Sequence, residues 1–384
     1  MKKGWQTKTL GDICEMYQPK TISGKEMVED GAYPVYGANG VIGRYNQFNH
    51  EEPQLLITCR GATCGSVNIS APRSWVTGNA MVVRPKNESI EMRYLEYIFR
   101  GGIDISRAIT GAAQPQITRT NLAPLEISYP VSLPEQQRIV GILDDAFEGI
   151  ATAKAKAEKN LHNARALFES HLQSVFTQRG KGWVEKSFSE LCDIKHGYAF
   201  EGEFFSNEGE YVLLTPGNFY ERGGYRDRGE KQKYYTGEIP RDYVLNEGDL
   251  LVAMTEQAAG LLGSPILAPE SDKFLHNQRL GLVSKKPGVA WTNEFFFHVF
   301  NTQPVRKAIH ASASGVKVRH TSPTKIGEVV VAFPISLPEQ KRIVTTLASL
   351  TEETQRLARL YERKLAALEA LKKSLLHQAF TGQL

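Results

Sequence analysis

Residues 132–143 of the chain read Ser-Leu-Pro-Glu-Gln-Gln-Arg-Ile-Val-Gly-Ile-Leu, and residues 336–347 repeat this stretch as Ser-Leu-Pro-Glu-Gln-Lys-Arg-Ile-Val-Thr-Thr-Leu. The match continues at one fixed offset, that from Ser132 to Ser336, until it ends at Phe176-Thr177 and Phe380-Thr381. We call this offset the repeat spacing. A repeat at one fixed, long spacing indicates a duplicated structural unit. We therefore interpret the chain as a tandem duplication.

A second repeat opens each half of the chain. Gly4-Trp5-x-x-Lys8-x-Leu10-x-x-Ile13-Cys14 corresponds to Gly182-Trp183-x-x-Lys186-x-Phe188-x-x-Leu191-Cys192. The offset from Gly4 to Gly182 is shorter than the repeat spacing, so the second half is longer than the first between its two repeated segments. Placed end to end, Phe380-Thr381 and Gly4-Trp5 would recreate the internal junction from Phe176 to Trp183. We expect a pseudo-twofold, circular arrangement in which the two termini lie close together.

Both repeated segments are expected to be long helices. Ser132 and Ser336 are suited to the N-cap, and Glu135 and Glu339 three residues later would complete a capping box. Apolar residues follow with a period of seven in the second helix, in the registers Ile343, Leu350, Leu357, Lys364, Leu371 and Leu347, Thr354, Tyr361, Leu368, Leu375. The equivalent positions of the first helix are mostly small: Ile139, Ala146, Ala153, Asn160, Leu167 and Leu143, Ile150, Ala157, Ala164, His171.

Large side chains of one helix can fill the space left by small side chains of the other, so the two helices are expected to pair within one chain. The pseudo-twofold relation makes that pair antiparallel. At 1.5 Å per residue each helix of ~43 residues would be roughly 65 Å long. The alternative is an ordinary helical hairpin without a special role, which explains neither the length nor the duplication.

The remaining sequence predicts mixed α and β structure. Short β-like runs such as 54–58, 249–252 and 329–331 are separated by Gly, Pro and Asn turns, and short helical stretches are expected near 94–99 and 293–300. The expected fold class is α+β (mixed α/β), with two pseudo-repeated globular domains separated by a long antiparallel two-helix coiled coil. The four expected segments are residues 1–131, 132–178, 179–335 and 336–384.

Composition excludes several classes of protein. The 384 residues are 41% hydrophobic and 23% charged, which is typical of a globular protein of two or three domains. There is no apolar run of about 20 residues, and the N-terminus leads into no apolar segment, so we expect neither a membrane span nor secretion. The four cysteines predict reduced thiols; a zinc site at Cys59 and Cys64 is the weaker alternative, because no second ligand pair lies nearby. A cytoplasmic protein is expected.

These features together resemble the specificity (S) subunits of type I restriction-modification systems. The resemblance covers essentially the whole chain and rests on the Leu-Pro-Glu-Gln-x-Arg-Ile-Val opening of each helix, on Tyr33-Pro34-Val35-Tyr36-Gly37-Ala38-Asn39-Gly40, on Arg60-Gly61 and on Gly111-Ala112-Ala113-Gln114-Pro115-Gln116-Ile117. It implies that each globular segment is a target recognition domain that reads one half of a bipartite DNA sequence. It also implies that the helices set the spacing between the halves and dock methyltransferase (M) subunits, two copies of which are joined by restriction (R) subunits. Because the second domain is longer and different, we expect the target to be asymmetric.

The sequence carries no catalytic motif that we recognise. A DNA-adenine methyltransferase would need an Asn/Asp-Pro-Pro-Tyr/Phe motif and a glycine-rich cofactor loop, and neither occurs. The Glu-x-Lys triplets at 339–341 and 362–364 lie on the long helix, where ion-paired surface is the better interpretation than a nuclease site. We expect a non-catalytic protein that binds no cofactor itself, with S-adenosylmethionine, ATP and Mg bound by the partner subunits.

Candidate DNA-binding residues are cations and amides in presumed loops. The strongest cluster runs from Arg222 to Tyr235, and a second stretch near Arg319 aligns with Gln114–Arg119 of the first half; a solvated charged loop is the alternative for both. The candidates are Lys20, Lys25, Arg44, Arg60, Arg73, Gln114, Gln116, Arg119, Arg222, Tyr225, Arg226, Arg228, Lys231, Lys233, Lys317, Arg319 and His320.

Coiled-coil and docking roles follow from the repeated helices and, by resemblance, from their Leu-Pro-Glu-Gln openings. These residues are Leu133, Pro134, Glu135, Gln136, Ile139, Leu143, Leu337, Pro338, Glu339, Gln340, Ile343, Leu347, Leu350, Leu357, Tyr361, Leu368, Leu371 and Leu375. The net charge of +4 favours a polyanionic partner only weakly. A duplicated coiled-coil adaptor that assembles proteins without binding DNA therefore stays open as a second hypothesis.

Overall fold

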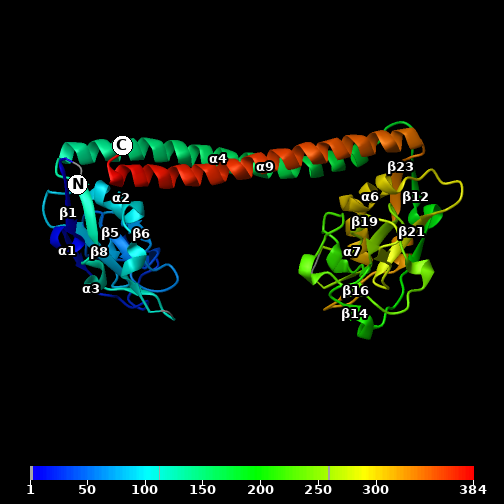
Figure 1. Cartoon of the computed structure of the whole chain (residues 1–384), viewed down its shortest axis with the longest axis horizontal. Coiled ribbons are helices and arrows are strands. Elements are labelled where there is room, and N and C mark those ends of the chain that lie inside the picture. The colour runs from blue at the N-terminus through cyan, green and yellow to red at the C-terminus, as the bar shows by residue number, and fades with distance from the viewer. Residues whose placement is uncertain (1–2, 112, 258–259) are drawn as a thin grey trace. The chain divides into compact units, whose positions relative to one another are not determined.

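The computed structural model describes residues 3–111, 113–257 and 260–384. Met1, Lys2 and Ala112, which belong to the expected chain junction and to the Gly111–Ile117 phrase, lie outside the described residues. The chain divides into two compact units: Met1–Lys159 with Tyr361–Leu384, and Asn160–Leu360. Each unit contains one globular domain, which we call domain 1 (residues 3–131) and domain 2 (residues 182–335), together with parts of both long helices (Figure 1).

The described residues of domain 1 form four small sheets. Its strands are β1 (Trp5–Thr9), β2 (Cys14–Tyr17), β3 (Tyr33–Gly37), β4 (Gly40–Tyr45), β5 (Leu55–Thr58), β6 (Val67–Ile69), β7 (Trp75–Val76), β8 (Ala80–Pro85), β9 (Ile109–Thr110), β10 (Gln116–Ile117) and β11 (Glu126–Pro130). Its helices are α1 (Leu10–Ile13), α2 (Met92–Tyr97), η1 (Ile98–Gly102), η2 (Ile105–Ala108) and α3 (Arg119–Leu122). The sheet orders are β2-β8-β5-β6, β4-β3-β7 and β1-β11, and strands β9 and β10 form a short hairpin.

Domain 2 follows the same plan with additions. Its strands are β12 (Trp183–Ser187), β13 (Cys192–His196), β14 (Phe205–Ser206), β15 (Tyr211–Leu213), β16 (Tyr234–Tyr235), β17 (Leu250–Ala253), β18 (Thr255–Glu256), β19 (Pro265–Leu267), β20 (Phe274–Leu275), β21 (Leu280–Lys285), β22 (Arg319–His320) and β23 (Val330–Pro334). Its helices are α5 (Phe188–Leu191), η3 (Gly202–Phe204), η4 (Pro216–Asn218), η5 (Gly229–Lys231), η6 (Arg241–Tyr243), α6 (Asn293–Asn301), α7 (Gln303–Ser312) and α8 (Pro323–Gly327). The sheet orders are β13-β21-β17-β19, β14-β16-β15-β20, β12-β23 and β18-β22.

The duplication extends through both globular domains. Strand order β2-β8-β5-β6 corresponds to β13-β21-β17-β19, and the parallel pair β3-β7 corresponds to the parallel pair β15-β20. Sequence similarity shows the duplication mainly at the ends of each half, whereas the shared strand order shows it throughout both domains. The mixed α and β class and the short strands expected near 54–58, 249–252 and 329–331 are confirmed.

The repeated opening motif forms the same local structure in both domains. Gly4 and Gly182 take φ values of +83° and +85°, a conformation that favours glycine, just before β1 and β12. One turn of helix follows each strand, and a capping box closes it: Thr9 with Asp12 in domain 1, and Ser187 with Glu190 in domain 2. The motif is therefore a strand–turn–strand unit whose apolar positions enter the domain core.

The long helices are α4 (Leu133–Gln178) and α9 (Leu337–Thr381), and they lie side by side in both units (Figure 1). In the first unit the start of α4 meets the end of α9: Ile139 and Leu143 share one core with Leu376 and Ala379. In the second unit the end of α4 meets the start of α9, where Leu172 contributes to one core with Ile343 and Leu347. The predicted antiparallel pairing is confirmed. No helix in the described part of the chain is both long enough and apolar enough to cross a bilayer.

Both chain ends pack in the first unit, as expected from the circular arrangement. Trp5, Phe380 and Leu384 pack against one core, and the Arg138 guanidinium donates to the backbone oxygen of Leu384 at 3.0 Å. The equivalent junction in the second unit places Phe176 against Trp183, with ring centroids 5.7 Å apart.

The heptad prediction holds along part of each helix and fails elsewhere. Buried residues follow it at Ile139, Leu143, Ile150, Ala157, Ala164, Ile343, Leu347 and Thr354. Leu167 and Leu371 are about half exposed, at 48% and 47%, and Leu172 and Leu376 are buried instead. A straight helix has 3.6 residues per turn, so a strict period of seven drifts off the contact seam within a few turns. The predicted seam positions Asn160 and Lys364 are exposed for the same reason.

A buried glutamine joins the start of each long helix to its own domain. Gln136 accepts the backbone N–H of Glu91 at 2.8 Å and donates to the carbonyls of Pro130 and Ser89 at 2.8 and 3.1 Å. Gln340 accepts the backbone N–H of Thr292 and donates to the carbonyls of Pro334 and Ala290, at 3.0, 2.9 and 2.9 Å. Both side chains are fully buried. The amide oxygen and the amide nitrogen of both side chains are therefore hydrogen-bonded within the chain.

The neighbouring glutamates act differently from the predicted capping box. The Glu339 carboxylate binds Arg342 through two bonds of 2.8 and 2.7 Å, while the backbone N–H of Glu339 donates to Ser336 Oγ at 3.4 Å. Only half of the box is therefore formed in the second helix. Glu135 binds Arg138 in the same two-bonded way.

We predict that Gln340→Ala lowers the free energy of unfolding by about 2–4 kcal/mol, because it leaves one N–H and two carbonyls buried without partners. Glu339→Ala is the matched control on the same helical turn; it removes an exposed ion pair and should cost less than about 1 kcal/mol. Urea denaturation of both variants measures the difference. Equal losses of stability would contradict the role assigned to Gln340.

Candidate nucleic-acid interface

Several predicted residues of domain 1 meet at one short hairpin. Hairpin 1 (residues 109–111 and 113–117) pairs Thr110 with Gln116, and Gln116 also lies opposite Arg60 in an isolated bridge. The backbone N–H of Ile117 donates to the carbonyl of Cys59 at 2.9 Å, which joins the hairpin to the loop that follows β5. Arg60, Gln114, Gln116 and Arg119 are all exposed at this place.

Domain 2 contains the equivalent hairpin. Hairpin 2 (residues 314–321) pairs Ser314 with His320, and the backbone N–H of Thr321 donates to the carbonyl of Met254 at 2.9 Å. Gly111 and Gly315, at the same place in each turn, have φ values of +86° and +100°. Thr118 and Ser322, the next equivalent pair, cap the short helices α3 and α8. Gly111 and Gly315 are separated by the repeat spacing, and so are Thr118 and Ser322.

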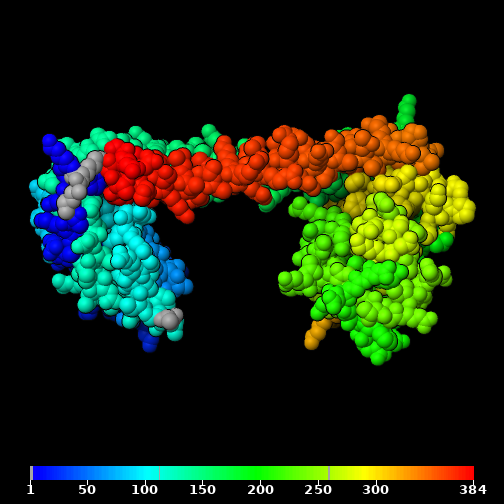
Figure 2. Space-filling model, in the orientation of Figure 1, coloured from blue at the N-terminus to red at the C-terminus, as the bar shows by residue number. Residues whose placement is uncertain are grey.

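The two hairpins present different side chains on the same backbone. The bridge between Arg60 and Gln116 in domain 1 corresponds to the pair Thr255 and His320 in domain 2. The tip of hairpin 2 carries Lys317 and Val316, whose side chain is 99% exposed. Figure 2 shows this segment standing out from the surface of domain 2. An apolar side chain so exposed suits contact with another molecule.

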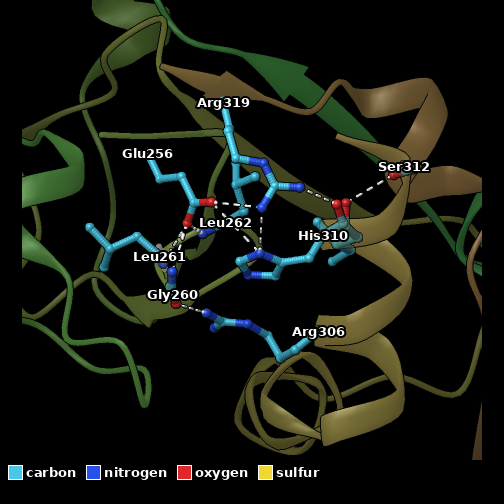
Figure 3. Close-up of polar contacts among 9 residues, drawn as sticks. Glu256, Gly260, Leu261, Leu262, Arg306, His310, Ser312 and Arg319 are labelled. Carbon is cyan, nitrogen blue, oxygen red and sulfur yellow. Dashed lines mark hydrogen bonds and ion pairs between the residues drawn. The ribbon is translucent and has the colours of Figure 1, made fainter. Parts of the chain in front are cut away.

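A buried carboxylate holds the base of hairpin 2. Glu256 Oε2 accepts the backbone N–H groups of Gly260, Leu261 and Leu262 at 2.9, 2.9 and 3.1 Å (Figure 3). Its other oxygen lies 3.4 Å from Arg319 Nη1. A buried carboxylate is tolerated only where charge and hydrogen bonds compensate its loss of hydration. Glu256 therefore fixes the loop after β18 and the strand β22 to each other.

Helix α7 completes this cluster. His310 Nδ1 lies 3.7 Å from Glu256 Oε1, and burial lowers the pKa of His310. Arg306 donates to the carbonyl of Gly260, and burial lowers the pKa of Arg306 to about 10 (Figure 3). Lys325 donates to the carbonyl of Ser312 at 2.7 Å. The cluster is internal structure that positions hairpin 2.

The DNA-binding role predicted for Arg319 is therefore corrected: its guanidinium has a structural role inside domain 2. Its guanidinium binds Glu256 and donates to the carbonyl of His310 at 2.5 Å, so its donors point into domain 2. The sequence pattern marked it as a cation in a loop, and only the fold brings its distant partner Glu256 beside it. Lys317 and His320 from the same stretch are exposed.

The basic cluster from Arg222 to Tyr235 lies mostly in the connection between β15 and β16, and its members have different environments. Tyr225 packs against Phe274 with ring centroids 5.3 Å apart, and burial raises its pKa, so it is a core residue rather than a DNA contact. Lys233 lies over the ring of Phe205, and Arg228 lies against the backbone of Gly217.

Four cations of this connection are exposed: Arg222, Arg226, Lys231 and Lys233. Arg222 is 3.8 Å from Glu169 of α4, a weak contact between exposed groups. The side chains of Arg226 and Lys231 are exposed and form no hydrogen bond or ion pair with the part of the chain that the structure describes.

The other candidates of domain 1 are scattered. Lys20 and Lys25 are exposed in the loop between β2 and β3. Arg44 donates to the carbonyls of Gly31 and Ala32, at 2.5 and 2.9 Å, and thus holds its own loop. Arg73 has a φ of +50° and forms an exposed ion pair with Glu51 at 3.6 Å. Arg44 is nevertheless exposed, so its contact with DNA stays a prediction.

The predicted docking residues divide by exposure. Gln136, Ile139, Leu143, Gln340, Ile343 and Leu347 are buried in their own chain and act as scaffold. Leu133, Glu135, Glu339, Leu350, Leu357, Tyr361, Leu368 and Leu375 are partly exposed, and Pro134, Leu337, Pro338 and Leu371 are exposed.

Sequence reasoning missed three residues that are at least partly exposed. Asn39 forms the turn between β3 and β4, and its Oδ1 accepts from Thr63 Oγ1 at 2.6 Å. Tyr220 lies at the equivalent place in domain 2 and is exposed. Thr255 is the counterpart of Arg60 and carries no charge that would have marked it.

The chain matches one family along most of its length. Residues 2–161 and 180–363 match the family model described as type I restriction modification DNA specificity domain. The chain is 26% identical, over 236 residues, to the type I restriction enzyme EcoBI specificity subunit of Escherichia coli. That alignment covers 61% of this chain and 44% of the relative, so the chain spans less than half the length of this curated relative.

Two solved structures share the fold. One, from work on the structural basis of complex assembly and conformational transition of the type I R-M system, has a TM-score of 0.76 at 16% identity and covers 100% of this chain and 99% of its own. The HsdS subunit from Thermoanaerobacter tengcongensis has a TM-score of 0.63 at 17% identity and covers 100% and 98%. At these identities the likeness concerns the fold alone.

We predict that Glu256→Ala lowers the free energy of unfolding by about 3 kcal/mol, because it leaves a guanidinium and three N–H groups without their acceptor. The amides of Leu261 and Leu262 should also exchange hydrogen faster. Glu270→Ala is the control: it removes an exposed pair with Lys273 and should cost less than about 1 kcal/mol. Denaturation with urea and hydrogen exchange measure both effects. An unchanged exchange rate at Leu261 would contradict the role of Glu256.

Proposed function

Because the chain belongs to the family of type I restriction modification DNA specificity domains, we propose that it is the subunit that selects the DNA target of such a system. Domain 1 reads one half of a bipartite sequence and domain 2 reads the other. The observation that carries this proposal is that two domains of one strand order present different connections and different exposed side chains around the same hairpin. Two copies of one protein fold with different surfaces suit two half-sites of different sequence.

The chemistry of the exposed groups supports DNA as the ligand. Arg60, Asn39 and Arg222 are exposed and present donors and acceptors of the kind that contact base edges. Lys317, Arg226 and Lys231 are exposed cations of the kind that contact phosphates. The net charge is only +4, so binding depends on these local groups and on partner subunits rather than on a strongly basic surface.

The same proposal assigns docking of methyltransferase (M) subunits to the ends of the helices. Val131 and Ile335 stand at equivalent places, directly before α4 and α9, and both are 57% exposed. A single exposed apolar side chain is common on protein surfaces. Exposed apolar side chains at two equivalent positions, however, are suited to binding two copies of one partner. We also propose that α4 and α9 set the spacing between half-sites.

Catalysis belongs to the partners in this proposal. The chain itself is non-catalytic and binds no cofactor; the M subunits carry S-adenosylmethionine, and the restriction (R) subunits carry ATP and Mg. The complex works in the cytoplasm, where the DNA is. Asymmetric recognition by the two domains then decides which sequence the M subunits methylate.

We predict that replacing residues 182–335 with the corresponding domain of another family member changes only the second half of the methylated sequence. The first half should persist, because domain 1 is untouched. Sequencing of modified bases in cells that carry the hybrid chain and the M subunit measures the outcome. Methylation at an unaltered sequence would contradict the proposal and favour the adaptor hypothesis.

We predict that Ile335→Asp weakens binding of one M subunit roughly 10- to 100-fold, which is the effect of losing one buried aliphatic side chain. Val131→Asp should weaken binding of the other copy, and the double variant both. Val330→Asp is the control, since Val330 is 59% exposed but its repeat partner is the polar Glu126. Native mass spectrometry counts the bound copies. Full occupancy in the double variant would place docking elsewhere.

A further inference from the structure

The two domains differ most in one connection between strands. In domain 1 only Ala38 and Asn39 join β3 to β4. In domain 2 the segment 214–233 joins the equivalent strands β15 and β16, and this loop contains η4 and η5. It accounts for most of the length by which the second half exceeds the first. It also carries the exposed cations Arg222, Arg226 and Lys231.

Both connections lie beside the loop that the hairpin contacts. In domain 1 that loop follows β5: Thr58 Oγ1 donates to the carbonyl of Ala38, and Thr63 Oγ1 donates to Asn39 Oδ1. In domain 2 the equivalent loop follows β17: Ser264 Oγ donates to the carbonyl of Tyr220 at 2.6 Å, and the backbone N–H of Gly224 donates to the carbonyl of Pro265 at 2.9 Å. The short turn and the long loop therefore occupy the same place in the fold.

The backbone of the two hairpins, in contrast, is shared, although their side chains differ. Both turns need glycine: an added Cβ would lie 2.6 Å from the carbonyl oxygen of Gln114 at position 111, and 2.1 Å from that of Val318 at position 315. At the tip of hairpin 2, the backbone N–H groups of Val316 and Lys317 donate to no residue within the described ranges. Free N–H groups beside an exposed lysine are suited to the oxygens of a DNA phosphate.

The two domains are proposed to read different sequences, yet they share the hairpin. The hairpin is therefore suited to contact a part of the DNA that both half-sites share. Every half-site has a phosphate backbone, whereas its base edges are its own. The feature that differs between the domains is then the one suited to the base edges. Arginine is the side chain that most often contacts guanine, and asparagine contacts adenine.

Resting on the proposed function, we propose a division of roles inside each recognition domain. Hairpins 1 and 2 bind the DNA backbone and position the domain, whichever sequence is read. The connection between β3 and β4, with Asn39, determines the first half-site. The loop 214–233, through Arg222 and Arg226, determines the second.

The experiment compares single variants in the complete complex of this chain with its M subunits. Lys317→Ala tests the hairpin, and Arg222→Ala and Arg226→Ala test the loop. Glu169→Ala is the matched control for Arg222, because it removes the ion-pair partner of Arg222 and leaves the arginine in place. All four residues are at least partly exposed, so the variants are expected to fold. Binding is measured on duplexes that carry the native target or one substituted base pair, over a series of salt concentrations, and modified bases are sequenced in cells.

Lys317→Ala should weaken binding to every duplex by the same factor and lower the slope of log affinity against log salt by about 0.9, the value for one phosphate contact. The methylated sequence should not change. Arg222→Ala or Arg226→Ala should reduce discrimination at one or more base pairs of the second half-site by about 5- to 150-fold. Glu169→Ala should leave discrimination unchanged.

Two outcomes would overturn the division of roles. One is a changed second half-site in Lys317→Ala; the other is an unchanged second half-site in both arginine variants. If Glu169→Ala reproduces the effect of Arg222→Ala, the arginine acts through its contact with α4, and the assignment of Arg222 fails. Failure of the proposed function is distinguishable from all of these, because the unaltered complex would then show no preference for any sequence in the second half.

Discussion

The rest of the structure depends on an amide that is buried at the start of each long helix. Gln136 and Gln340 connect the first turn of α4 or α9 to the last strand and to the helix start of the preceding domain, through three hydrogen bonds for Gln136 and four for Gln340. Only a side chain with both an acceptor and two donors satisfies these backbone groups at once. A domain joined in this way cannot turn about its own helix without breaking buried hydrogen bonds, so the helix fixes the orientation of the domain that precedes it.

Much of this scaffold could be predicted from the sequence, because its signals are local or periodic. The repeat of the segment at Ser132 by the segment at Ser336 predicts the duplication, and the apolar periodicity predicts two long helices and their antiparallel pairing. The prediction failed where it extended a period of seven along a whole helix: Leu371 is half exposed, and Leu376 is buried in its place. The burial of Gln136 was not foreseen either, since its partners Glu91 and Ser89 are distant in the sequence and follow no pattern in it.

The candidate site was predicted less well, for a physical reason. Whether a cation is available to DNA depends on which acceptors the fold brings near it. Arg319 and Lys317 are close neighbours on one hairpin, yet Arg319 binds the buried Glu256 while Lys317 stays in water. Arg44 and Tyr225 likewise have partners inside the domain. The sequence marks the residue type and the loop, but the partner comes from strands that pair only in the folded domain.

The same distinction explains how a duplicated chain came to hold two unlike domains on one scaffold. A residue with internal partners, such as Gln136 or Gln340, cannot be exchanged without leaving buried groups unsatisfied, at a cost that is a large fraction of the stability of a domain. Exposed side chains of the loop 214–233, such as Arg226 and Lys231, have no such partners within the described residues, so they can change in type at little cost. Duplication therefore preserves the parts that bind each other and frees the parts that face the solvent. Surfaces that contact a variable ligand are expected to diverge first, and in this chain the largest divergence lies beside the two hairpins that both domains retain.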